Sequence, residues 1–172
     1  MTAIRDGDHY VVNGQKIWTS YAQYADRMFC LVRTDDSVKP QAGISFLLIE
    51  MDTPGITVRP IISQDNDHTL NEVFFEDVRV PIENLVGVEG AAFKQTMVQL
   101  AHERGGIDRL VSNRPLYDLA LEHANRNDPR VRQEIATIEA GYHLGRLMIY
   151  RGALGQGPAD FSAGTKLFCT EH

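Results

Sequence analysis

The sequence predicts an α+β fold, in which an antiparallel β-sandwich or barrel precedes an incomplete antiparallel helix bundle. In the first half, short runs rich in β-branched and aromatic residues alternate with turn residues, as in small all-β domains. From Ala91 onward, apolar residues recur every three or four positions, which is the period of a helix. The change falls near Gly87 to Gly90. We therefore assign residues 1–88 to a β domain and residues 89–172 to a helical domain.

Turn residues locate the strands of the β domain. Asn13 and Gly14 lie between two strand-forming runs and tolerate the positive φ of a two-residue turn, so a tight hairpin is predicted there. The turn Asp52-Thr53-Pro54-Gly55 combines a proline that presets φ with a glycine for the left-handed position. Further strands are predicted at 28–33, 44–50, 56–62 and 72–80.

The first two helical segments are divided by a proline. A helix is predicted from about Ala91, and Pro115 should end or kink it, because a proline inside a helix costs roughly 3 kcal/mol. A second segment then runs to about Asn125. A last helix is expected from about Pro158, with Leu167 and Phe168 on its apolar side.

The longest helix has the clearest signals. Asp128 and Pro129 form an N-cap followed by a first-turn proline. The apolar stripe that follows is interrupted at Gly145, where a neighbouring element can approach closely. Its members are Val131, Ile135, Ile138, Tyr142 and Ile149. We expect the chain to end inside its last helix, so that more chain or another subunit is needed to cover these apolar stripes.

Composition excludes several classes of function. A chain of 172 residues with 43% apolar residues and a net charge of −6 is typical of a soluble globular protein. Nucleic acid is not an expected partner, because the arginines at 126, 130 and 132 are interrupted by Asp128 and Pro129. The longest strongly apolar run, 44–49, is far shorter than the roughly 20 residues of a membrane span.

The termini and the cysteines add two expectations. The first residues lack the layout of a secretory signal, so a cytoplasmic location is expected. Cys30 and Cys169 show neither a CxxC pair nor the spacing of metal ligands. Buried free thiols and the absence of a metal site are therefore predicted.

Several segments are distinctive in combination. The β half contains Asn13-Gly14-Gln15-Lys16-Ile17-Trp18-Thr19-Ser20 and Val73-Phe74-Phe75-Glu76-Asp77-Val78-Arg79-Val80-Pro81, and the helical half contains Gly90-Ala91-Ala92-Phe93 and Glu103-Arg104. In this order and spacing, they resemble the acyl-CoA dehydrogenases over nearly the whole chain. The resemblance implies a middle β domain and part of a C-terminal four-helix bundle. The family's N-terminal helical domain and its last helices are expected to lie outside this sequence.

The resemblance also implies FAD as cofactor. Desaturation of a thioester needs a base for the α-proton and an acceptor for the β-hydride, and no side chain accepts hydride. Trp18, Thr19 and Ser20 match the family segment that contacts the isoalloxazine ring through hydrogen bonds and the indole. Without the resemblance, Trp18 would be interpreted as a core or edge aromatic of a strand.

Glu103 matches the position at which a subset of the family carries its catalytic glutamate. The resemblance implies that it removes the α-proton, and a carboxylate buried beside an acyl chain would be a stronger base. Ala101, His102 and Arg104 match the segment that contacts acyl-CoA. The alternatives are a surface glutamate at 103 and a structural ion pair for Arg104.

One region departs from the family pattern. Where most members carry Arg-x-x-Phe-Gly, this chain has His123-Ala124-Asn125-Arg126-Asn127-Asp128-Pro129. Gln133 still matches the FAD-contacting glutamine, and Arg132, like Arg126 and Arg130, offers a positive charge for the pyrophosphate. A solvated helix start is the alternative for these arginines. Some steroid-degrading members of the family are heteromeric and show similar departures.

Two classes of function follow. In the first, the chain is part of an acyl-CoA dehydrogenase of fatty acid or steroid side-chain degradation. That enzyme would be a homo- or hetero-oligomer that passes electrons to an electron-transferring flavoprotein. In the second, the chain is a non-catalytic truncated module or structural subunit beside a catalytic partner. A flavin monooxygenase-like relative on the same fold is a third interpretation, because fold does not fix reaction.

Overall fold

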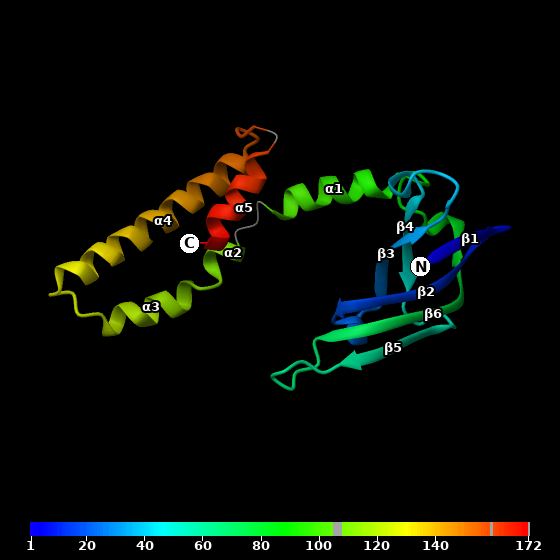
Figure 1. The fold of residues 1–172 in the computed structure, drawn as a ribbon, viewed down its shortest axis with the longest axis horizontal. Helices are drawn as coiled ribbons and strands as arrows, with labels where there is room; N and C mark the ends of the chain where they lie inside the picture. Colours follow the sequence, from blue (N-terminus) through cyan, green and yellow to red (C-terminus); the bar gives the residue numbers. More distant parts are fainter. Residues whose placement is uncertain (105–107, 159, 172) are drawn as a thin grey trace. The chain divides into compact units, whose positions relative to one another are not determined.

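The computed structural model describes residues 1–104, 108–158 and 160–171. The chain divides into two compact units, Met1–Thr96 and Met97–His172. The first unit contains a β-sheet and the second contains helices (Figure 1). The predicted α+β class is confirmed.

Six strands form a single sheet in the first unit. They are β1 (Thr2–Asp6), β2 (His9–Ser20), β3 (Arg27–Arg33), β4 (Ile44–Glu50), β5 (Ile56–Ile61) and β6 (Leu70–Pro81), in the spatial order β4-β3-β1-β2-β6-β5. β1 and β3 pair in parallel at Thr2 and Arg33, whereas all other neighbours are antiparallel. The prediction of an antiparallel sandwich or barrel is therefore wrong, because the sheet is mixed and not closed. The parallel pair arises because the chain crosses past β1 after leaving β2.

The predicted hairpin at Asn13 and Gly14 is also wrong, because β2 runs straight through both residues. The register between β2 and β6 shifts at this point, and Gly14 has φ 127°, which indicates a β-bulge. Asn13 holds the bulge from its side chain: Nδ2 donates to Asp77 Oδ1 and Oδ1 accepts from the Asp77 amide, both at 2.9 Å. The tight turn lies between β1 and β2, where Gly7 has φ 62°.

Alternation along the strands builds the core of the first unit. In β4, every second residue is buried, as expected for a strand with one face toward the core. The predicted turn before β5 is present, with Gly55 at φ 95°. The buried cluster consists of Ala3, Tyr10, Val12, Ala22, Cys30, Val32, Leu47, Ile49, Val73, Phe75, Val78 and Val80.

In the described part of the chain after the sheet, the α-helices are α1 (Ala92–Glu103), α2 (Asp108–Val111), α3 (Arg114–His123), α4 (Pro129–Ala153) and α5 (Phe161–Glu171). The helix predicted from about Ala91 ends at Glu103, earlier than expected, and the separate helix α2 ends at Val111. Pro115 stands in the first turn of α3, so a helix break does precede it. The predicted cap of α4 is confirmed as well, because Asp128 Oδ1 accepts a hydrogen bond from the Arg130 amide at 2.8 Å.

Gly145 is the buried point of α4, as the sequence predicts. A Cβ atom placed there would lie 2.7 Å from Leu110 Cδ1 and 3.5 Å from Cys169 Sγ, so α2 and α5 approach α4 closely at this glycine. In α5, Leu167 is 58% exposed and Phe168 is half-buried, whereas Thr165 and Cys169 are buried. Ala159, in the predicted start of this helix, lies outside the described residues.

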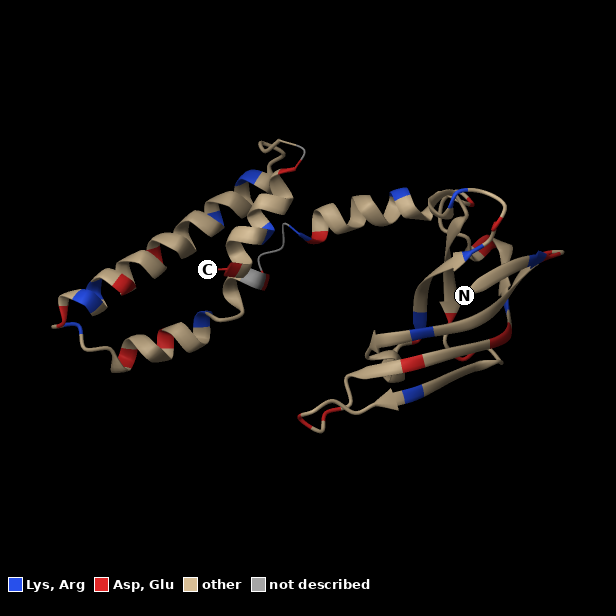
Figure 2. Cartoon of the chain, in the orientation of Figure 1, with Lys and Arg blue, Asp and Glu red and all other residues tan. Residues whose placement is uncertain are grey.

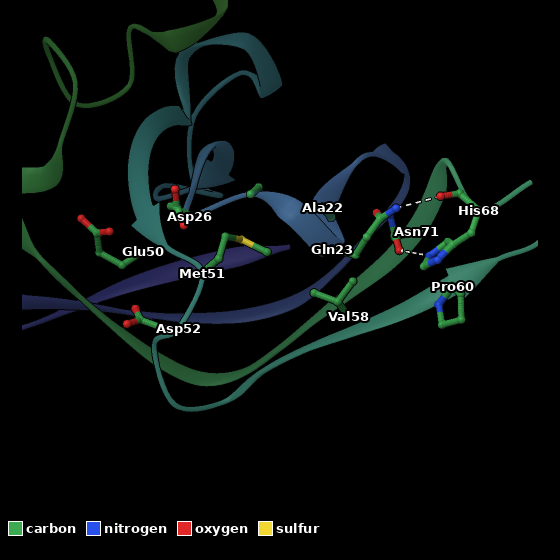
Figure 3. Close-up of a pocket in the computed structure, with 11 residues that line it drawn as sticks. Ala22, Gln23, Asp26, Glu50, Met51, Asp52, Val58, Pro60, His68 and Asn71 are labelled. Carbon is green, nitrogen blue, oxygen red and sulfur yellow. Dashed lines mark hydrogen bonds between the residues drawn. The ribbon is translucent and has the colours of Figure 1, made fainter.

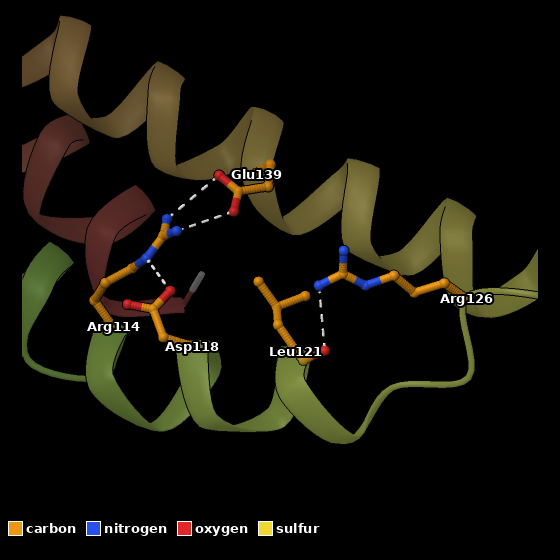
Figure 4. Close-up of polar contacts among 5 residues, drawn as sticks. All are labelled: Arg114, Asp118, Leu121, Arg126 and Glu139. Carbon is orange, nitrogen blue, oxygen red and sulfur yellow. Dashed lines mark hydrogen bonds and ion pairs between the residues drawn. The ribbon is translucent and has the colours of Figure 1, made fainter.

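Arg114 joins α3 to α4 (Figure 4). Its guanidinium donates two hydrogen bonds to Glu139, at 3.1 and 3.3 Å, and one to Asp118 at 2.8 Å. It also lies over the rings of Tyr117 and Tyr142. The hydrogen bonds from Arg114 lower the pKa of Glu139 from its ordinary value.

Charge, hydropathy and the thiols agree with the expectations from composition. Figure 2 shows acidic and basic residues interspersed along both units. Among the described helices, none is both long enough and apolar enough to cross a bilayer. Cys30 and Cys169 are free and buried, and burial raises the pKa of both thiols.

Candidate active site

Trp18 lies in a second bulge of β2. The register between β2 and β6 shifts between Lys16 and Thr19, and Trp18 has φ 60°. This conformation is uncommon for a residue with a side chain and costs on the order of 1 kcal/mol. Bulges of this kind redirect side chains, and Trp18 as a whole is 61% exposed. Trp18 is therefore not part of the sheet core.

Thr19 and Ser20 follow Trp18 at the end of β2. Thr19 is half-buried and Ser20 is exposed, so this segment presents a hydroxyl beside the exposed indole. Tyr21 comes next with φ 56°, and its amide donates to the Thr69 carbonyl at 2.8 Å. Thr19 and Ser20 thus lie between two left-handed backbone positions, Trp18 and Tyr21.

A cavity of about 490 Å³ with both polar and apolar lining residues lies in the same unit (Figure 3). Among the residues that line it, Asn71 is completely buried and its Nδ2 donates to the Thr19 carbonyl at 3.1 Å. Sequence reasoning missed Asn71. The available signal was its residue type, because asparagine is depleted in strands and this one opens a run of strand-forming residues.

The predicted substrate segment occupies the end of α1. Ala101, His102, Glu103 and Arg104 are all exposed, and the Arg104 amide donates to the Leu100 carbonyl at 3.1 Å. Among the described residues, no side-chain ion pair joins Glu103 or Arg104 to another group. The burial that would strengthen Glu103 as a base is therefore not supplied by the described chain.

Ala101 and His102 line an apolar cavity of about 320 Å³ within the second unit. Met148, Ile149 and Phe161 form its other walls. The cavity thus lies at the C-terminal end of α4, beside the predicted substrate segment.

Arg132 and Gln133 lie at the other end of α4. Arg132 Nη1 donates to the carbonyls of Arg126 and Asn127, at 3.3 and 3.4 Å, and so holds the loop before the helix. Gln133 is exposed. With a rise of about 1.5 Å per residue, Gln133 and Ile149 are about 24 Å apart along α4. The structure therefore separates this pair from Ala101 and His102 within the unit.

The segment Trp18-Thr19-Ser20 suits a flavin ring. A planar ring needs an exposed aromatic surface and nearby hydrogen-bonding groups, and Trp18, Thr19 and Ser20 provide them from one stretch of backbone. The residues present therefore fit the cofactor that the resemblance implies.

A mixed β-sheet followed along the chain by helices matches the acyl-CoA dehydrogenase fold. Residues 1–78 match the family model described as the acyl-CoA dehydrogenase middle domain. The chain belongs to the acyl-CoA dehydrogenase family.

Relatives of known name agree with this assignment. Acyl-CoA dehydrogenase IpdE1 of Mycobacterium tuberculosis is 37% identical over 166 residues, which is 92% of this chain and 42% of that protein. An acyl-CoA dehydrogenase structure from Geobacillus kaustophilus matches with TM-score 0.87 and 29% identity, over 99% of this chain and 50% of that one. The ChsE4–ChsE5 complex from Mycobacterium tuberculosis matches with TM-score 0.79 and 32% identity, over 99% and 47%. The chain spans about half or less of the length of these relatives.

Proposed function

We propose that this chain supplies cofactor- and substrate-contacting groups for the FAD-dependent α,β-dehydrogenation of an acyl-CoA thioester. The observation that carries the proposal is the exposed indole of Trp18, held at φ 60° in a bulge next to Thr19 and Ser20. A strained conformation with an exposed aromatic side chain favours a ligand-contacting role over a packing role. The names of the relatives support acyl-CoA as the substrate class.

The proposed roles divide between the units. Trp18, Thr19 and Ser20 would hold FAD, which when bound supplies the hydride acceptor that the reaction needs. Glu103 takes the α-proton onto its carboxylate, and Ala101, His102 and Arg104 hold the thioester near it. Gln133 contacts FAD, whereas Arg132 is less available to the FAD pyrophosphate, because its guanidinium already donates to two carbonyl groups.

Two further roles belong to the same proposal. An electron-transferring flavoprotein receives the electrons, and the active assembly is a homo- or hetero-oligomer. A neighbouring subunit or further chain would then supply the burial around Glu103 that the described residues lack.

The first experiment titrates the purified 172-residue chain with FAD while recording Trp18 fluorescence. Trp18 is the only tryptophan, so its quenching reports binding at this segment. We expect saturable quenching in the parent chain. In Trp18→Leu, which has no tryptophan, FAD binding is measured by flavin absorption, and we expect it to be lost. Tyr24→Leu is the matched control, because Tyr24 is an exposed aromatic of the same unit. If the parent chain shows neither quenching nor flavin absorption, cofactor binding by this chain is refuted.

The second experiment tests the base. In a flavin-loaded assembly that turns over acyl-CoA with an artificial electron acceptor, Glu103→Gln should abolish turnover and leave FAD binding intact. Glu122→Gln, an exposed glutamate of α3, is the control that should retain activity. Full turnover by Glu103→Gln would assign the base to another residue.

A non-catalytic structural subunit is the second candidate. It is favoured by the exposure of Glu103 and by the likeness to a complex named for two components. This alternative predicts that the chain forms a stable complex with a flavin-bearing dehydrogenase subunit, and that Glu103→Gln leaves the turnover of that complex unchanged.

A further inference from the structure

The buried amide of Asn71 lies behind the proposed flavin-contacting segment. Asn71 is completely buried on β6, and its Nδ2 donates to two acceptors, the Thr19 carbonyl at 3.1 Å and Gln23 Oε1 at 2.6 Å. His68 Nε2 lies 2.8 Å from Asn71 Oδ1, and Gln23 Nε2 donates to the His68 carbonyl at 2.7 Å (Figure 3). Asn71, Gln23 and His68 thus form a closed ring of hydrogen bonds, from which Asn71 also donates to one backbone carbonyl of β2.

The donors and acceptors of this ring can be assigned without ambiguity. Backbone carbonyls only accept, so the groups facing the carbonyls of Thr19 and His68 are the amide nitrogens of Asn71 and Gln23. Asn71 Oδ1 is then the acceptor, and His68 Nε2 is protonated and donates the hydrogen bond to it. Both Nδ2 hydrogens of Asn71 have partners, as a buried amide requires.

The backbone beside this ring is strained on both sides. Trp18 and Tyr21 have φ 60° and 56°, and Thr19 and Ser20 lie between them. Such conformations persist only where the surroundings fix them. The bond from Asn71 to the Thr19 carbonyl fixes the middle of the segment, and the bond from the Tyr21 amide to the Thr69 carbonyl fixes its end.

We propose that Asn71, supported by Gln23 and His68, is a positioning residue that holds Trp18, Thr19 and Ser20 in a flavin-binding conformation. It acts from inside the sheet, through the Thr19 carbonyl, and without contact with the ligand. The inference rests on the proposed function for its purpose, but the positioning itself is measurable in the protein without FAD.

The test compares Asn71→Asp with Asn84→Asp in the full chain. Aspartate at 71 keeps the size of asparagine but places an acceptor against both the Thr19 carbonyl and Gln23 Oε1. Asn84 is the matched control, because its Nδ2 also donates to a backbone carbonyl of the same unit, that of Leu48 at 2.9 Å. The first readout, without FAD, is the fluorescence anisotropy of Trp18, with far-ultraviolet CD as the check on folding. We expect the anisotropy to fall in Asn71→Asp and to be unchanged in Asn84→Asp.

Gln23→Ala provides a second variant if Asn71→Asp does not fold. It removes one partner of the Asn71 amide from a half-buried position and keeps the bond to Thr19, so a smaller fall in anisotropy is expected. An unchanged Trp18 anisotropy in a folded Asn71→Asp would overturn the proposal. If Asn71→Asp does not fold, an unchanged Trp18 anisotropy in Gln23→Ala would overturn it. An equal change in Asn84→Asp would overturn it as well.

FAD titration then separates this inference from the proposed function. We expect Asn71→Asp to weaken FAD binding by about tenfold, which corresponds to about 1.4 kcal/mol. Gln23→Ala should weaken FAD binding to a smaller degree. A parent chain that binds no FAD refutes the proposed function, while the anisotropy still decides whether Asn71 positions Trp18. FAD affinity that is unchanged in a variant with a mobile Trp18 refutes the role of Asn71 in flavin binding.

Discussion

The sheet unit and the helical unit bury apolar side chains to very different degrees. The sheet unit encloses a cluster of twelve buried residues. In the helical unit, the described buried residues are Leu110, Gly145, Thr165 and Cys169. Six leucines among the described residues of this unit are about half exposed or more: Leu116, Leu119, Leu144, Leu147, Leu154 and Leu167. Apolar burial therefore stabilises the sheet more than the described helices, which approach closely at Gly145 and are also joined by polar contacts such as that of Arg114.

The largest expected effect comes from truncating the sheet core. Phe75→Ala should lower the free energy of unfolding of the sheet unit by roughly 3–5 kcal/mol, because a completely packed phenylalanine leaves a cavity. Denaturant titration followed by Trp18 fluorescence measures it, since Trp18 lies in the same unit.

Leu116→Ala is the matched truncation in the helical unit. Leu116 is 69% exposed, so its loss should change stability by no more than about 0.5 kcal/mol, as measured by far-ultraviolet CD. If both substitutions destabilise equally, the leucines of the helical unit are covered in solution, and the comparison between the units fails.

The next effect concerns the point at which the helices approach most closely. Gly145→Val should destabilise the helical unit by roughly 1–3 kcal/mol, because its side chain would displace the buried Leu110. Gly164→Ala in α5 is the control: nothing lies near a Cβ there, so alanine should stabilise the helix by about 1 kcal/mol. Thermal melts of the two variants should therefore shift in opposite directions, and a stabilised Gly145→Val would show that α4 is not held at this glycine.

Local signals predicted the parts of the fold that depend on nearby residues. The Asp128 cap, the break before Pro115 and the close approach at Gly145 each follow from one residue type at one position. The Asn13-Gly14 pair misled because a bulge and a hairpin turn both accept left-handed glycine, and only pairing with β6 decides between them. The parallel contact of β1 with β3 depends on how the chain crosses the sheet, which no local pattern encodes.

The candidate site shows the same division. The sequence alone identifies Trp18, Thr19 and Ser20 as candidate cofactor-binding residues. The exposure of Trp18, however, depends on a register shift between β2 and β6 that only the paired strands reveal. Asn71 went unnoticed because its partners at Thr19 and Gln23 are distant in sequence. The roles of Glu103, Arg132 and Gln133 remain predictions, since each is exposed or engaged with local backbone.

The smallest effect, the pH dependence of the bond between Arg114 and Glu139, tests whether polar contacts hold the helices. The hydrogen bonds from Arg114 lower the pKa of Glu139 from its ordinary value of 4.5, so the folded state binds this proton more weakly than the unfolded state. The stabilisation is therefore present above about pH 4.5 and is lost as the pH falls through the lowered pKa. Glu139→Gln should lower the melting temperature of the helical unit slightly at pH 7, because both side chains are about one third exposed, and this difference should shrink in acid.

Glu50→Gln is the control for that last prediction, because Glu50, with a side chain 44% exposed, pairs in the sheet unit with Arg27, whose side chain is 63% exposed. With a large apolar core beneath it, the sheet unit should show almost no change in its transition at either pH. A loss in Glu139→Gln that stays constant from pH 7 into acid would mean that Glu139 acts by packing rather than by charge. The helical unit would then owe its cohesion to apolar contacts after all, as the sheet does.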